Sequence, residues 1–102
     1  MTISFSMVDL PMIETNEKPV QQEEIENLLG AGFNFDLILD FDLDKNAYLI
    51  YVKYHNKKII RQVYSQRKKP RAFKDIKRAI DWGKKLGFKT VSTTINYSVY
   101  PE

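Results

Sequence analysis

Nine residues near the middle of the chain, from Phe35 to Leu43, alternate more regularly than any other stretch. Large apolar side chains occupy every odd position, and aspartates occupy three of the four even positions. A period of two residues places alternate side chains on opposite faces of a β-strand. The stretch therefore predicts a half-buried strand with an acidic outer face, and such a strand needs partner strands and a core on its apolar side.

Two further strands are predicted immediately afterwards. Residues 48–54 and 58–64 are rich in β-branched and aromatic residues, and the turn-forming sequences Asp-Lys-Asn (44–46) and His-Asn-Lys (55–57) precede them. This spacing predicts a three-stranded antiparallel meander. Residues 2–8 and 89–99 also alternate, which predicts one additional strand near each end of the chain.

Two helices complete the prediction. The first runs from about Val20 to Ala31 with Ile25, Leu28 and Leu29 as its apolar stripe. The second runs from about Ala72 to Leu86, with Gly87 at its C-terminal end. The predicted order is β-α-β-β-β-α-β. We expect one α+β domain over residues 1–102, built as a single mostly antiparallel sheet with both helices packed on one face.

The net charge of +3 hides a steep division along the chain. Residues 1–47 carry a net charge of −8 and residues 48–102 a net charge of +11. Such asymmetry acts on association with partners and not on the fold. Two interpretations remain open: the basic half forms a face for a polyanion, or the two halves interleave in space and neutralise each other.

The basic half contains a tract that suits phosphate groups. Arginine, lysine and a helix N-terminus all donate hydrogen bonds to phosphate oxygens. The candidate nucleic-acid-binding residues are Lys57, Lys58, Arg61, Arg67, Lys68, Lys69, Arg71, Lys74, Lys77 and Arg78.

Residues 20–86 resemble the double-stranded-RNA-binding domain in their helix, three strands, helix order and in the basic cluster RKKPRAFK before the second helix. They depart from it in Pro70, in the lack of an alanine-rich second helix and in the added terminal strands. Residues 35–86 are similar in order to the DNA-binding modules of phage integrases. The string RAFKDIKRAIDWGKKLGFKTV looks like the ending of small uncharacterised plasmid- and phage-borne proteins. These likenesses imply nucleic-acid binding and a mobile-element origin.

The acidic half offers a second candidate surface. Alternate aspartates on a strand could imitate nucleic-acid phosphates and meet a basic protein. The same pattern also suits an edge strand that is protected by charge. A calcium loop of the EF-hand kind is excluded, because Lys45 and Tyr51 stand where the required Gly and Glu would be. The candidate protein-binding residues are Asp36, Asp40, Asp42, Asp44, Glu23 and Glu24.

Nothing in the sequence marks an enzyme. The chain has no cysteine and one histidine, His55, in a predicted turn, and its glycines do not form a phosphate-binding loop. We therefore expect no catalytic residues, no metal site and no cofactor. No apolar run approaches the roughly 18–20 residues that cross a bilayer, and the first residues lack the pattern of a secretory signal. We expect a cytoplasmic protein with no membrane contact.

The sequence thus predicts a small non-enzymatic binding protein. The favoured partner is nucleic acid, DNA or RNA, bound through residues 57–78. The alternative is a phage- or plasmid-type inhibitor or adaptor that binds a basic host protein through its acidic N-terminal half. A homodimer is compatible with either interpretation.

Overall fold

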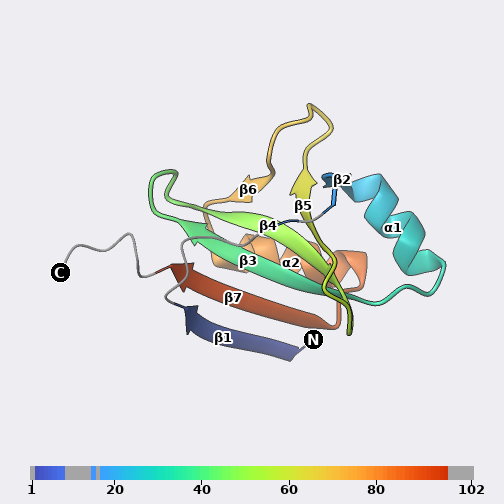
Figure 1. The fold of residues 1–102 in the computed structure, drawn as a ribbon. Coiled ribbons are helices and arrows are strands. Elements are labelled where there is room, and N and C mark those ends of the chain that lie inside the picture. Colours follow the sequence, from blue (N-terminus) through green and yellow to red (C-terminus); the bar gives the residue numbers. More distant parts are fainter. Residues whose placement is uncertain (1, 9–14, 16, 97–102) are drawn as a thin grey trace.

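The computed structural model describes residues 2–8, 15 and 17–96, which form a mixed β-sheet and two helices (Figure 1). In chain order the elements are β1 (Thr2–Val8), β2 (Val20–Gln21), α1 (Gln22–Gly30), β3 (Phe35–Asp42), β4 (Ala47–Tyr54), β5 (Ile60–Tyr64), β6 (Ala72–Phe73), α2 (Ile76–Leu86) and β7 (Thr90–Asn96). The α+β class is confirmed, with two short strands that the sequence did not predict. Neither described helix is long and apolar enough to cross a membrane.

The sheet follows the order β1-β7-β3-β4-β5-β2, and β6 pairs with β4 outside this path. Strands β3, β4 and β5 form the predicted antiparallel meander. The outer strands add parallel pairs, because β7 runs parallel to both β1 and β3, and β2 runs parallel to β5. The alternating strand β3 therefore lies inside the sheet, between β7 and β4, and the interpretation of it as a charged edge strand is wrong.

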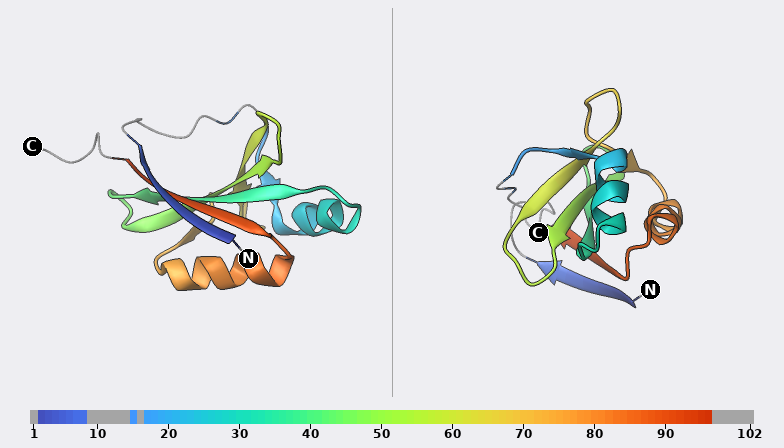
Figure 2. Two further views of the ribbon diagram at one scale, coloured as in Figure 1. Left: turned by 90° about the horizontal axis from the view of Figure 1, so that it is seen from below. Right: turned by 90° about the vertical axis from the view of Figure 1, so that its right-hand side faces the viewer.

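Both helices lie on the same face of the sheet, as predicted (Figure 2). The indole Nε1 of Trp82 in α2 donates to Gln22 Oε1 at the start of α1 over 3.1 Å, which joins the two helices directly. Between the helices and the sheet, the odd-numbered side chains of β3 meet the even-numbered side chains of β4, with Leu37 opposite Val52 and Leu39 opposite Ile50. All four of these side chains are fully buried.

The second helix starts later than the sequence predicts. Residues Ala72 and Phe73 are not helical but pair with Leu49 and Tyr48 of β4. The helix begins at Ile76, where the Asp75 carboxylate accepts a 2.9 Å hydrogen bond from the backbone N–H of Lys77. Asp75 is thus a side-chain N-cap that satisfies a free N–H group of the first turn. For Ala72 and Phe73, pairing with β4 therefore replaces the helical conformation that the sequence predicts.

The face of the sheet away from the helices is more buried than its composition suggests. Leu49 and Tyr51 in β4 retain only 9% and 6% of their accessible surface, respectively, and Asp40 in β3 retains 9%. Burial, followed by the negative charges of Asp40 and Asp42, raises the pKa of Tyr51 to about 12. The prediction of a solvent-facing row of aspartates therefore fails at Asp40.

Candidate nucleic-acid interface

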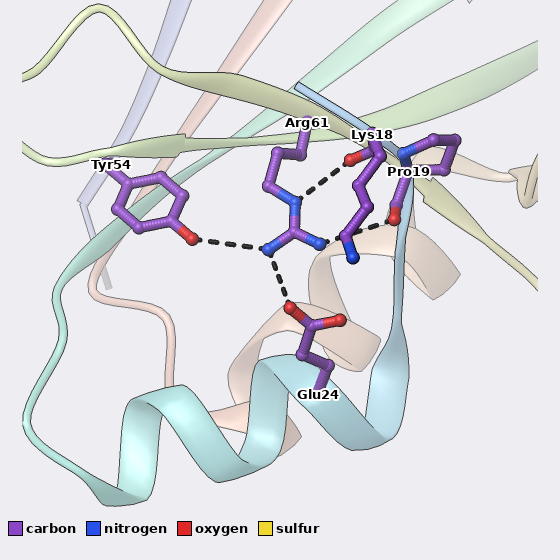
Figure 3. Close-up of polar contacts among 5 residues, drawn as sticks. All are labelled: Lys18, Pro19, Glu24, Tyr54 and Arg61. Carbon is purple, nitrogen blue, oxygen red and sulfur yellow. Dashed lines mark hydrogen bonds and ion pairs between the residues drawn. The ribbon is translucent and has the colours of Figure 1, made fainter.

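One residue of the predicted basic tract, Arg61, lies in the interior of the protein. It faces the helices because it sits opposite Val52 in the pairing of β4 with β5, and it is only 6% exposed. Its Nη1 donates to Glu24 Oε2 over 2.7 Å and to the Tyr54 hydroxyl over 3.3 Å (Figure 3). Burial would lower the pKa of Arg61, but these hydrogen bonds raise it above its ordinary value.

Two backbone carbonyls complete the environment of this guanidinium. Arg61 Nε donates to the Lys18 carbonyl over 3.0 Å, and Nη2 donates to the Pro19 carbonyl over 3.4 Å (Figure 3). Arg61 therefore fastens the chain before β2, helix α1 and strand β5 to one another. Every nitrogen of its guanidinium group is engaged inside the protein, so Arg61 does not belong to the exposed basic surface.

The next seven residues after β5 leave the sheet and return to it. Strands β5 and β6 pair with successive parts of β4, at residues 51–53 and 48–49. Between them, residues 65–71 project from the sheet as a loop, here called the basic arm (Figure 1). The arm therefore interrupts what would otherwise be one strand along β4.

Backbone hydrogen bonds close the arm into a short ribbon. The N–H of Arg71 donates to the Val63 carbonyl over 2.9 Å, and the N–H of Ser65 donates to the Lys69 carbonyl over 2.7 Å. Between these hydrogen bonds, Tyr64 and Pro70 form an isolated antiparallel β-bridge. At the tip, the N–H of Lys68 donates to the Ser65 carbonyl over 2.9 Å, and Lys68 has a φ of 61°. A turn followed by a left-handed residue is a common way to close a hairpin. The exposed residues of the arm are Gln66, Arg67, Lys68, Lys69 and Pro70.

Arg71 holds the base of the arm against helix α2. Its guanidinium carbon lies 5.0 Å from the centre of the Phe73 ring and 5.8 Å from that of Trp82. Such cation–π contacts contribute roughly 0.5–1 kcal/mol each at partly exposed sites. Arg71 is half-buried, so we assign it a positioning role in the arm in place of the direct phosphate contact that the sequence suggested.

Helix α2 carries a row of cations on its solvent face. Four exposed bases are spaced so that they lie on one side of the helix. We call them the basic stripe: Lys77, Arg78, Lys84 and Lys85. Exposed Lys74 precedes them in the connection from β6. The N-terminus of the helix is less suited to phosphate than the sequence suggested, because the Asp75 carboxylate already caps it.

Lys57 and Lys58 lie in the turn between β4 and β5, whereas the arm leaves from the opposite end of β5. Five residues of strand separate these ends by about 13 Å. The ten predicted residues therefore do not form one continuous surface. Six of them are exposed and near one another in the chain, on the arm, in the connection from β6 and at the start of α2: Arg67, Lys68, Lys69, Lys74, Lys77 and Arg78.

Most of the candidate acidic surface is engaged within the protein. Asp36 lies 3.1 Å from His55 Nδ1 and 4.0 Å from Lys53 Nζ. Asp42 accepts hydrogen bonds from the backbone N–H groups of Asp44 and Lys45 and so closes the turn after β3. Glu24 pairs with Arg61, and Asp40 is buried. Of the six predicted acidic residues, Glu23 and Asp44 are exposed without an ion pair among the described residues.

The two charged halves of the chain meet in space. The contacts of Asp36 with Lys53 and His55, and of Glu24 with Arg61, each join an acid of the first half to a basic residue of the second. Glu23 and Glu24 of α1 and Lys68 of the arm line one hollow of ≈ 710 Å³. The interpretation that the halves interleave thus holds at these points, but it does not extend to the basic stripe.

His55 and Asp36 also line a smaller hollow of ≈ 230 Å³, together with Asn34 and Lys89. The sequence placed His55 in a turn but did not indicate its contact with Asp36, because the pair is 19 residues apart. Among the described residues there is no group of three His, Asp or Glu side chains that could hold a metal ion.

Comparison with known proteins does not assign the chain to a family. No family model, no curated protein and no solved structure matches it.

Proposed function

We propose that this chain is a non-enzymatic nucleic-acid-binding protein that uses the basic arm and the basic stripe. One observation carries the proposal. Among the residues that the structure describes, the cations Arg67, Lys68, Lys69, Lys74, Lys77, Arg78, Lys84 and Lys85 are all exposed, and none of them forms an ion pair.

The chemistry of this set favours a phosphate backbone. Residues 67–85 hold nine bases and two acids, Asp75 and Asp81, within 19 residues. Unpaired arginine and lysine side chains release the counterions of a polyanion when they bind it, which is the main driving force of sequence-independent nucleic-acid binding. The contact of Arg71 with Trp82 joins the base of the arm to helix α2, which carries the basic stripe.

The alternative, an acidic surface for a basic host protein, receives less support from the contacts. Such a surface needs carboxylates that are free to pair with a partner. Asp36, Asp42 and Glu24 instead make contacts within the chain, and Asp40 is buried.

Fluorescence anisotropy tests the proposal directly. Labelled duplex DNA, duplex RNA and single-stranded DNA are titrated at about 50 and 200 mM salt, where six phosphate contacts predict an affinity loss of roughly 10³-fold. The variant Lys68→Glu with Lys69→Glu should abolish binding at both salt concentrations. The control, Lys45→Glu with Lys89→Glu, removes the same charge from exposed positions outside residues 67–85 and should weaken binding by less than about tenfold.

Two results would count against the proposal. An absence of binding to all three nucleic acids at 50 mM salt would remove it altogether. Equal losses in the two double variants would show that only the net charge of the protein matters and would reject a defined interface.

A further inference from the structure

The tip of the basic arm contains an unusual residue for its backbone conformation. Three residues other than glycine have positive φ in the described chain, and each lies in a turn between strands: Asn46 (50°), Asn56 (60°) and Lys68 (61°). Asparagine is enriched in the left-handed region, whereas most side chains are strained there. The chain thus places asparagine in two of its turns and lysine in the third.

No contact inside the protein explains this lysine. Lys68 is exposed and makes no side-chain hydrogen bond or ion pair with any residue that the structure describes. A strained residue that persists without an internal partner points to a role outside the fold.

We propose that the basic arm enters a groove of duplex nucleic acid, with Lys68 contacting a backbone phosphate from the tip of the arm. This inference rests on the proposed function and names its partner as a double helix. The arm is a ribbon of two short chain segments, about 5 Å apart where they pair. The major groove of B-form DNA, about 12 Å wide, admits a two-stranded ribbon of this kind.

A single strand is a poorer match to the same surface. Proteins that bind single strands without sequence preference stack bases on exposed aromatic rings. Among the described residues, Phe33 is the only large apolar side chain that is exposed. It lies between α1 and β3, outside the arm and the stripe. Tyr64 at the base of the arm and Trp82 in α2 are both half-buried, and Trp82 is covered by Arg71.

The substitution Lys68→Gly separates a role in binding from a role in folding. Glycine adopts positive φ without strain, so the variant should be more stable, with Tm raised by about 4 °C. It should nevertheless bind a duplex of about 20 base pairs roughly tenfold more weakly, and the slope of log affinity against log salt should fall by about 1. Lys68→Asn, which imitates the other two turns, should behave in the same way.

The matched control is Lys45→Ala, which removes one exposed charge from a turn outside the arm and the basic stripe. It should weaken duplex binding by less than about threefold, and wild-type protein should bind the duplex at least about tenfold more tightly than the same strand alone. Three results would overturn the inference while leaving the proposed function standing: equal losses for Lys68→Gly and Lys45→Ala, no preference of the wild type for the duplex, or a lower Tm for Lys68→Gly. If the wild type binds no nucleic acid at about 50 mM salt, both proposals fail.

Discussion

Replacing Arg61 by alanine should destabilise the protein strongly, although sequence alone would class this arginine as one more surface cation. The side chain is 7% exposed and donates to Glu24, Tyr54 and two backbone carbonyls. The variant removes all four hydrogen bonds at once. It also leaves a space between α1 and β5 that water must fill.

The expected loss follows from the two short hydrogen bonds. Hydrogen bonds to a charged group contribute about 1.5–3 kcal/mol each, and the contacts at 3.3 and 3.4 Å add less. Part of this is recovered, because the Glu24 side chain is 47% exposed and water can solvate its carboxylate in the variant. We therefore expect a decrease of about 2–4 kcal/mol in the free energy of unfolding, out of a typical total of 5–15.

Urea unfolding measures this decrease, and the fluorescence of Trp82, the only tryptophan, reports it. With an m-value of about 1.5 kcal/mol/M, the midpoint should fall by roughly 2 M. Arg67→Ala is the matched control, because Arg67 is an exposed arginine of the arm and its loss should cost less than about 0.5 kcal/mol. In a double-mutant cycle, Arg61→Ala and Glu24→Ala should show a coupling of at least about 1 kcal/mol. Equal midpoints for Arg61→Ala and Arg67→Ala, or strictly additive losses with Glu24→Ala, would refute the reasoning.

Two further predictions concern single ionisable groups. Glu23 lines the same hollow as Lys68. Replacing it by glutamine should therefore raise the affinity for a duplex about threefold at low salt and leave the affinity unchanged near 1 M salt. The control Asp44→Asn should leave the affinity unchanged at both salt concentrations, and anisotropy titrations check both variants. Because burial, Asp40 and Asp42 raise the pKa of Tyr51 to about 12 from 10.0, its contribution to stability is complete below pH 10 and is lost as the pH rises through 12. Urea midpoints across this range should therefore fall less steeply for Tyr51→Phe than for the wild type, and parallel curves would contradict the raised pKa.

Local patterns predicted much of the fold. Alternation identified β3, β4, β5 and β7 to within a few residues. A half-buried strand has apolar side chains on one face and polar ones on the other, so its residues alternate along the sequence. Parallel pairing could not be predicted in this way, because the pairing of β7 with β1 and β3 joins segments that are distant in the chain.

The errors at the site have a common physical cause. A run of charges along the chain does not show which residues are exposed, because burial depends on the face of the strand that a residue occupies. Arg61 precedes Val63 by two residues and so shares its buried face, a sign that was available in the sequence. Strand β6, in contrast, left no local pattern, because it consists of two residues that a helical period also accommodates.

The position of β1 has a consequence for how the protein is made. Thr2 of β1 pairs with Thr90 of β7, 88 residues later in the chain, and β7 is the only strand with which β1 pairs in the described residues. A ribosome adding roughly 5–20 residues per second therefore releases β1 several seconds before β7 exists. The meander of β3, β4 and β5 can assemble during that interval, but β1 must wait for β7, which is synthesised after it. An insertion before β7 would prolong the time in which β1 has no partner strand. During that time its backbone could pair with the same segment of a neighbouring nascent chain.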